Sequence, residues 1–216
     1  MANLFSHDNL MFMLAGLKLT IIIAVATTFF SVIIGTILAI IRNYCIGKLK
    51  IFGILSIIYI EIFRCTPCIL WILIFRFTIK GNPTYLGILS FTLFTSAVVA
   101  ELIRGGLNAI PKGQIEAGES QGFGFVRILI YIILPQTFRS IIPSLFSQVT
   151  TIVKDTSYLK VVDIHEFMLN TSYVMNTATT VSQILVMYGF VALTYFLINF
   201  AMSCCVRHYH SKIRIA

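Results

Sequence analysis

Residues 19–41, LTIIIAVATTFFSVIIGTILAII, carry no charged side chain. A helix needs roughly 20 apolar residues to cross the hydrocarbon core of a bilayer, so this run is long enough to span a membrane. It is also too long for the core of a secretory signal peptide, and we expect it to be retained. Because the run is continuous and does not alternate between apolar and polar residues, it predicts a helix and excludes a membrane β-barrel.

The whole chain has the composition of an integral membrane protein. Of its 216 residues, 58% are hydrophobic and only 11% are charged, whereas roughly 25% are charged in an ordinary soluble domain. We therefore expect an all-α, polytopic membrane protein with a single transmembrane domain over residues 1–216. The second span should be tilted or broken near Pro67, and the fourth is interrupted by Pro143. The five expected spans cover about 11–41, 52–79, 84–105, 138–157 and 181–205, with a cytoplasmic loop at about 106–137.

The basic residues predict the orientation of these spans, because cytoplasmic connections of membrane proteins are enriched in Lys and Arg. With the N-terminus outside, the outer connections hold only Lys80, Lys154 and Lys160. This places the C-terminus and loop 106–137 in the cytoplasm and segment 158–180 outside. It also accounts for the net charge of +8 without a nucleic-acid partner. The inner segments hold Arg42, Lys48, Lys50, Arg104, Lys112, Arg127, Arg139, Arg207, Lys212 and Arg214.

Cysteine and histidine spacing predicts neither a metal site nor redox chemistry. Cys65 and Cys68 have the CxxC spacing, but they lie in an apolar span without the βαβ context of a redox fold. His165, His208 and His210 lack a third ligand nearby. We expect no metal on this chain.

Loop 106–137 predicts two short helices joined by a glycine turn. Pro111 suits the first turn of a helix that runs to Gln121, and Gly122 with Gly124 would end it. A second apolar helix follows over 126–133, which Pro135 would disturb near its end. From these residues alone, the pair could dock in a groove of a partner protein or lie flat on lipid headgroups.

The spacing within this loop resembles the EAA motif of the permeases of ATP-binding-cassette importers. In that family, Glu-Ala-Ala is followed after three residues by Gly, and after nine more by Ile, one residue, Leu and Pro. The one departure here is Gly118 in place of the third alanine. The residues that fit the motif are Glu116, Ala117, Gly118, Gly122, Ile132, Leu134 and Pro135.

Further stretches resemble the permeases for polar amino acids in particular. They are Glu61 to Pro67 (EIFRCTP), Ala100 to Gly106 (AELIRGG) leading to Pro111 to Gln114 (PKGQ), and Leu134 to Gln136 (LPQ) running on to Lys154 to Ser157 (KDTS). The subfamily usually has other residue types where Cys65, Cys68 and Tyr158 stand.

The resemblance implies a transport subunit that is not itself an enzyme. It would be located in the bacterial inner membrane and would form the translocation pathway, while a separate ATPase holds ATP and Mg. In agreement, the chain contains no G-x-x-x-x-G-K-[ST] phosphate loop. The implied partners are cytoplasmic ATPase subunits docking on the EAA-like helices, a second permease, identical or homologous, and an extracytoplasmic binding protein that delivers a polar amino acid. Segment 158–180 is the expected docking surface for that binding protein.

Charged residues inside the expected spans are the candidates for the substrate pathway, because buried charges usually face the interior of a helix bundle. Glu101 and Asp155, with Thr156 and Ser157, could hold the headgroup of the amino acid, and Glu61, Arg64 and Thr66 lie in a second motif. The alternative is structural: Glu61 with Arg64, and Glu101 with Arg104, could pair at i,i+3 on one helix face.

Two other function classes account for part of the sequence. A passive or ion-coupled transporter or channel would explain the charges within the spans but not the EAA-like spacing. A membrane scaffold that recruits a partner would explain the loop but implies no transport.

Overall fold

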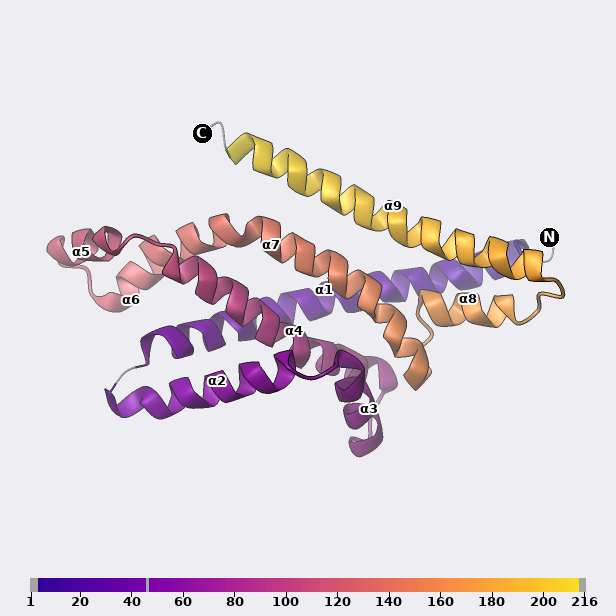
Figure 1. Ribbon diagram of the computed structural model, residues 1–216, viewed down its shortest axis with the longest axis horizontal. Coiled ribbons are helices and arrows are strands. Elements are labelled where there is room, and N and C mark those ends of the chain that lie inside the picture. Colours follow the sequence, from indigo (N-terminus) through magenta and orange to yellow (C-terminus); the bar gives the residue numbers. More distant parts are fainter. Residues whose placement is uncertain (1–3, 46, 214–216) are drawn as a thin grey trace. The chain divides into compact units, whose positions relative to one another are not determined.

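The computed structural model describes residues 4–45 and 47–213. For Lys48 and residues 208–213 only the backbone is described, so the side chains of His208, His210 and Lys212 lie outside the description, as does Arg214 altogether. All regular structure in the described residues is helical (Figure 1). The element order is α1 (His7–Tyr44), η1 (Gly47–Leu49), α2 (Lys50–Arg64), α3 (Cys68–Thr78), α4 (Pro83–Asn108), α5 (Lys112–Ser120), α6 (Phe125–Ile128), η2 (Leu129–Ile133), α7 (Leu134–Asp155), η3 (Thr156–Val162), α8 (Phe167–Met175) and α9 (Val181–Ile213).

Within the described residues, four helices are long and apolar enough to cross a membrane: His7–Tyr44, Pro83–Asn108, Phe125–Val162 and Val181–Arg207. A fifth span is possible where α2 and α3 form a pair bent by 101°. The protein is therefore a polytopic helical membrane protein. Helices occupy all five expected ranges, and α1 and α4 extend beyond theirs at both ends.

The break between α2 and α3 falls at Pro67, where the sequence indicated one. Proline has no N–H to donate, and the residue before it avoids helical backbone angles. The Cys65 N–H still bonds to the Glu61 carbonyl at 2.9 Å, and the Thr66 hydroxyl donates to the Ile62 carbonyl at 2.7 Å. Pro67 itself is extended, with φ −63° and ψ 133°. Two carbonyl groups at the end of α2 thus have hydrogen-bond donors nearby in the chain, before the chain changes direction at Pro67.

The fourth span differs from the expected one. The expected interruptions at Pro135 and Pro143 are not present: α6 continues through the π-helical turn η2 directly into α7, and Pro143 lies inside α7. A proline removes one backbone hydrogen bond, and a π-helical turn is a common way to accommodate such a defect within a continuous helix. The second helix of the predicted pair is therefore the beginning of a long span.

The chain folds into two compact units, which are described separately. One unit comprises Met1–Phe29, Pro67–Thr92 and Val149–Ala216, and the other comprises Phe30–Thr66 and Leu93–Gln148. We call them the first and the second unit.

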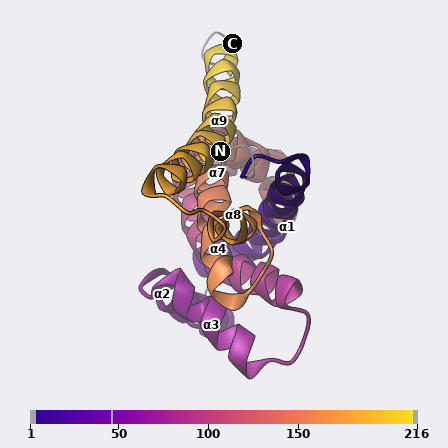
Figure 2. The ribbon, with the colours of Figure 1, turned by 90° about the vertical axis from the view of Figure 1, so that its right-hand side faces the viewer.

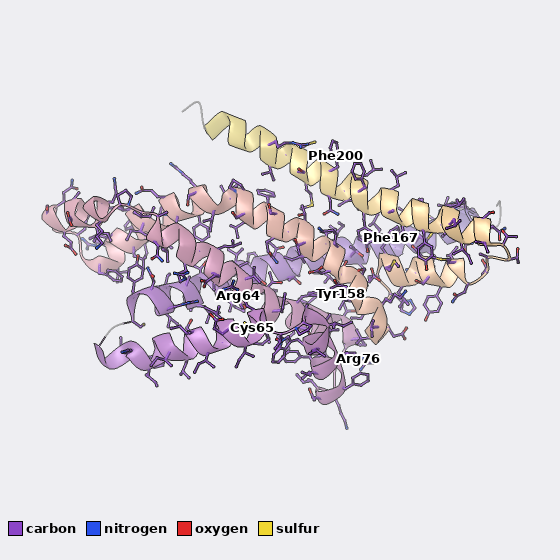
Figure 3. The ribbon with its side chains drawn as sticks, in the orientation of Figure 1. Arg64, Cys65, Arg76, Tyr158, Phe167 and Phe200 are labelled. Carbon is purple, nitrogen blue, oxygen red and sulfur yellow. The ribbon has the colours of Figure 1, made fainter. Side chains whose placement is uncertain are left out.

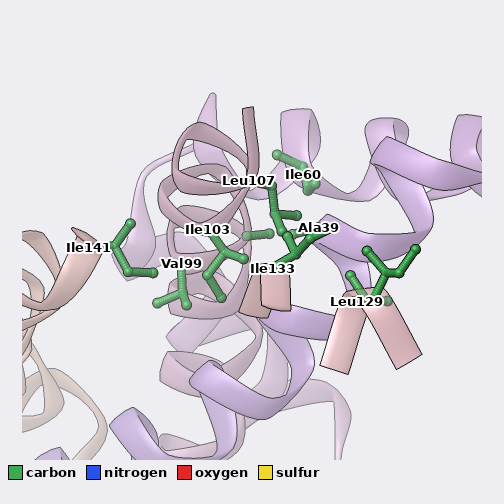
Figure 4. Packing of buried hydrophobic residues seen from close by; sticks show 10 residues of the cluster. Ala39, Ile60, Val99, Ile103, Leu107, Leu129, Ile133 and Ile141 are labelled. Atoms are coloured by element: carbon green, nitrogen blue, oxygen red, sulfur yellow. The ribbon is translucent and has the colours of Figure 1, made fainter. Parts of the chain in front are cut away.

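The second unit has a core in which α1, α2, α4 and the η2 turn meet (Figure 4). Two contacts show how closely α1 approaches α4 and α2. A side chain on Gly35 would come within 3.0 Å of the α4 backbone at Ser96 and Ala100, and the Ser56 hydroxyl donates to the Leu38 carbonyl at 2.9 Å. Glycine and serine allow these helices to approach closely, as is common in membrane bundles. The core residues are Ala39, Ile60, Val99, Ala100, Ile103, Leu107, Ile128, Leu129, Ile133 and Ile141.

The first unit is built around the short helix α8, which packs on η3 and on α9 (Figures 1 and 2). It also packs on α1: a side chain on Gly16 would lie 2.9 Å from the Glu166 backbone, and the Asn170 amide donates to the Phe12 carbonyl at 2.8 Å. Phe167 is buried among Phe190 and Tyr195 of α9. The stretch that the sequence placed in an outer connection is thus an ordered helix with its own core.

Candidate coupling and substrate sites

Three of the EAA-like residues, Glu116, Ala117 and Gly118, lie in the short helix α5, which ends at a glycine cap. Gly122 has φ +79°, a backbone conformation that favours glycine. The Phe123 N–H bonds to the Gly118 carbonyl at 3.0 Å, and the Gly122 N–H bonds to the Glu119 carbonyl at 2.9 Å. This pair of bonds is a Schellman cap, and it fixes the direction in which the chain leaves α5.

Gly118, the one departure from the motif, is buried where α5 packs on the following helix. A Cβ atom at this position would lie 2.9 Å from Ile128 Cγ1 and 3.2 Å from Ile132 Cδ1. The substitution of glycine for alanine therefore accompanies a very close approach of the two helices. Glu116 and Ala117 are exposed on α5, and Pro135 is also exposed. Ile132 and Leu134 are half-buried against the core of the second unit.

Glu101 lies at the centre of a cluster of three arginines in the second unit, which we call the arginine cluster: Arg42, Arg64 and Arg104 around Glu101. Arg42 Nη1 lies 2.6 Å from Glu101 Oε2, and Arg104 Nη2 lies 2.6 Å from Glu101 Oε1. Arg104 Nε also donates to Oε1 at 2.9 Å. Arg64 Nη1 is more distant from Oε1, at 3.8 Å.

Helix direction explains how Arg42 and Arg64 reach the same carboxylate. The contact of Ser56 with Leu38 shows that α1 and α2 run antiparallel as a hairpin. Side chains on a helix lean toward its N-terminus. Arg42 near the end of α1 and Arg64 at the end of α2 therefore lean toward each other, with Glu101 of α4 between them.

One of the two expected i,i+3 pairs is present and the other is replaced. Glu101 pairs with Arg104, but Arg64 turns to Glu101 and not to Glu61. The Glu61 carboxylate is exposed, and its Oε2 lies 3.7 Å from the Cys65 sulfur. Figure 3 labels Arg64 and Cys65 at the end of α2. Helix spacing alone could not decide between these partners, because the competing carboxylate comes from α4.

The remaining pathway candidates belong to the first unit. Asp155 is the last residue of α7 and is half-buried. The Thr156 hydroxyl is buried and donates to the Val153 carbonyl at 2.8 Å, so it is occupied within its own helix. Ser157 lines an open, mainly apolar groove of about 480 Å³. The groove is also lined by Tyr158, Met168, Val191 and Tyr195.

Glu166 is a buried carboxylate that sequence reasoning placed in an outer connection without a role. It caps α8: its carboxylate accepts the N–H groups of Met168 and Leu169, each at 2.8 Å. The Thr20 hydroxyl lies 3.5 Å from Oε2. Burial raises the pKa of Glu166 to about 7, although these hydrogen bonds oppose the rise. Glutamate is not among the preferred N-cap residues, so this helix start gave no signal in the sequence.

Histidine and cysteine side chains form no metal centre within the part of the chain that the structure describes. His165 stacks on Tyr173 with ring centroids 5.6 Å apart, and its Nδ1 lies 3.2 Å from the Asn170 amide oxygen. Cys65 and Cys68 are free thiols. His165 therefore acts in packing beside α8.

This geometry defines the class as a polytopic helical membrane protein with an EAA-like helix and glycine turn. Residues 31–215 match the family of binding-protein-dependent transport system inner membrane components. The chain belongs to this family.

Similar proteins support the assignment over nearly the whole length. The chain is 30% identical over 208 residues to the "Probable glutamine ABC transporter permease protein GlnP" of Bacillus subtilis (strain 168), covering 94% of each sequence. It is 33% identical over 167 residues to the "Arginine transport system permease protein ArtQ" of the same organism, covering 73% of each.

Solved structures show the same fold. The "Crystal structure of an amino acid ABC transporter with histidines" superposes with a TM-score of 0.81 at 22% identity, covering 93% of this chain and 94% of the other. A structure of the MetNI methionine ABC transporter in an inward-facing conformation gives 0.76 at 20% identity, covering 94% and 99%.

Proposed function

We propose that this chain is the permease subunit of an ATP-driven importer of polar amino acids in a bacterial inner membrane. Membership in the family implies ATPase and binding-protein partners in general. The names of the relatives, a glutamine and an arginine permease, support an amide or basic amino acid as substrate. We propose that the N-terminus lies outside and the C-terminus in the cytoplasm.

The observation that carries this proposal is the α5 helix with its glycine cap. It presents exposed Glu116 and Ala117, while Gly118 fixes its other face against Ile128 and Ile132. A short helix held rigidly at the start of a span is suited to transmit a displacement, because a packed contact moves as a unit. We propose that Glu116, Ala117, Gly118, Gly122, Ile132, Leu134 and Pro135 form the coupling surface for the ATPase, which holds ATP and Mg.

The outer face is proposed to receive the binding protein at segment 158–180. Tyr173 and Asp163 are exposed there, and the Tyr173 hydroxyl donates to Asp163 at 3.3 Å. A second permease, identical or homologous, would complete the pathway, because a few helices enclose little space. The residues that we propose to line the pathway include Asp155, Thr156, Ser157, Glu61 and Thr66.

Two cross-linking positions test the proposal and its orientation together. A photo-reactive residue at position 116 should capture the ATPase in native membranes, and one at position 173 should capture the binding protein. Capture of the ATPase from position 173, or its absence at 116, would contradict the assignment.

Reconstitution tests the energy source. In proteoliposomes with the ATPase and the binding protein, uptake of L-glutamine or L-arginine should require ATP. Uptake that persists without ATP would favour a passive or ion-coupled transporter, and a complex with no flux would favour a scaffold.

A further inference from the structure

The arginine cluster carries more positive than negative charge. Three guanidinium groups share the single carboxylate of Glu101 within 4 Å, which leaves a net charge of +2. Glu61, the one acidic residue of α2, forms no ion pair with Arg64 among the described residues, and its carboxylate lies beside the Cys65 sulfur. Charged residues inside a membrane span are costly and often mark the path of an ion or substrate, and Arg64 and Glu101 lie within two of the expected spans. An anion would balance the remaining positive charge.

Of the three arginines, Arg64 has N–H groups that are not used in a short contact with Glu101. Charge-assisted hydrogen bonds between Arg and carboxylate are about 2.7–2.9 Å long, and the Arg42 and Arg104 contacts are this short. Arg64 remains 3.8 Å away. Its side chain is also the most exposed, at 39% against 33% for Arg104 and 18% for Arg42. A guanidinium has five N–H donors in a planar fork that fits a carboxylate, so Arg64 can bind a second carboxylate in addition to Glu101.

Both carboxylate oxygens of Glu101, by contrast, already accept hydrogen bonds. Its Oε1 accepts two N–H groups of Arg104, and its Oε2 accepts Arg42. A carboxylate held in this way has little capacity to bind the ammonium group of an amino acid. Glu101 was expected to help hold the headgroup of the amino acid, and its contacts with Arg42 and Arg104 instead favour a role in positioning these arginines.

We propose that Arg64 binds the α-carboxylate of the transported amino acid, and that Glu101 is a positioning residue that holds Arg42 and Arg104 beside it. The inference rests on the proposed function, since an amino-acid importer passes a carboxylate through each cycle. Arg64 lies at the end of α2, directly before the helix break, so its guanidinium is not enclosed by a following turn. Arg64 would contact the α-carboxylate, which all amino acids share, so other residues would select among substrate side chains.

Direct binding tests the proposal. The permease with its ATPase is placed in nanodiscs without the binding protein, and equilibrium binding of L-[³H]glutamine and L-[³H]arginine is measured. Arg64→Gln should raise the Kd of the bound amino acid about 10- to 100-fold, the effect of losing a hydrogen bond between charged groups. Arg64→Lys should give an intermediate value, because it retains the charge but loses the fork.

Arg76 provides the matched control. It is an arginine in the last turn of α3, outside the cluster (Figure 3). Arg76→Gln should leave the Kd within about twofold of the wild type. Co-elution with the ATPase as a single species verifies that each variant is folded.

A change of ligand separates binding from a purely structural effect. Converting the α-carboxylate of the same amino acid to a carboxamide should weaken its binding to the wild type, while Arg64→Gln should bind acid and amide equally. Equal binding of both by the wild type would overturn the proposal. So would an Arg64→Gln variant that keeps its amino-acid affinity but loses a co-purifying phospholipid, which would assign the anion site to a lipid phosphate.

The proposed function can fail separately. A wild-type complex with no ATP-driven uptake would reject the importer assignment and the inference together. A wild type that transports, with an Arg64→Gln variant that binds both probes normally, would reject the inference alone.

Discussion

Glu101 and Glu166 are two carboxylates in very different surroundings. Glu101 in the second unit retains a side-chain exposure of 20% and is surrounded by three arginines. Glu166 in the first unit is fully buried, and its carboxylate accepts hydrogen bonds from two backbone N–H groups and a hydroxyl. One carboxylate is paired with charged side chains, and the other accepts hydrogen bonds at the start of a helix.

The difference teaches which carboxylate is free to change its charge. A guanidinium keeps its charge at every accessible pH, so the arginines around Glu101 supply full positive charges to its carboxylate. Backbone N–H groups and a helix dipole supply only partial charges, which do not offset complete burial at Glu166. We therefore expect Glu166 to respond to pH and Glu101 to respond to loss of its arginines.

The largest expected effect is on the pH dependence of unfolding. Because the pKa of Glu166 is raised from 4.5 to about 7, the folded protein binds a proton that the unfolded chain releases. Its contribution is therefore fully present below pH 4.5 and is lost as the pH rises through 7. The loss is roughly 3 kcal/mol of unfolding free energy.

Denaturant unfolding of the detergent-solubilised protein at pH 4.5 to 8 measures this loss. Glu166→Gln should flatten the curve, whereas Glu119→Gln, at an exposed position of α5, should leave it unchanged. A wild-type and Glu166→Gln pair with parallel curves would show that this carboxyl does not titrate differently in the folded state.

Glu101→Gln tests the other side of the comparison. Without the shared carboxylate, three guanidiniums repel one another, and we expect a loss of about 2 kcal/mol, less than for a fully enclosed pair because these side chains are partly exposed. The midpoint of unfolding should fall at all pH values. Glu61→Gln is the control, and an equal loss in that variant would argue against the arginine cluster as the cause.

Gly16→Ala tests whether α1 must approach Glu166 this closely. The new Cβ would lie 2.8 Å from Asn170 Nδ2 and 2.9 Å from the Glu166 carbonyl, and backbone atoms cannot move aside freely. We expect a loss of about 1 to 2 kcal/mol. Gly105→Ala, next to Arg104 and with open space around it, should instead stabilise α4 slightly. Opposite signs in thermal unfolding would support the contact; a neutral Gly16→Ala would contradict it.

The smallest effect is expected at Thr20. Its hydroxyl accepts the Phe167 N–H at 3.2 Å and lies beside Glu166. Thr20→Val leaves that buried N–H unpaired and should cost about 1 kcal/mol. It should also raise the pKa of Glu166 further, seen as a shift of the pH-dependent limb to higher pH. Thr28→Val, which removes only a bond within α1, should leave that limb in place.

Much of this molecule follows from local sequence. Apolar runs predicted the membrane helices, Pro67 predicted the break after α2, and Gly122 predicted the end of α5. Each depends on properties of a few neighbouring residues: hydrophobicity, a missing N–H, or a positive φ. The partners of the charges did not follow, because Arg64 had carboxylates available on two helices and only the packing of α4 against the α1–α2 hairpin selected Glu101.

By itself, the sequence determined that this chain consists of membrane helices and a short helix with a glycine cap, since burial in lipid and backbone geometry act on short stretches. Tertiary structure alone decided that Glu101 is shared by three arginines and that Glu166 is buried beneath α1. The reason is physical: the energy of a charge depends on every group within a few ångströms, and those groups come from segments far apart in the chain.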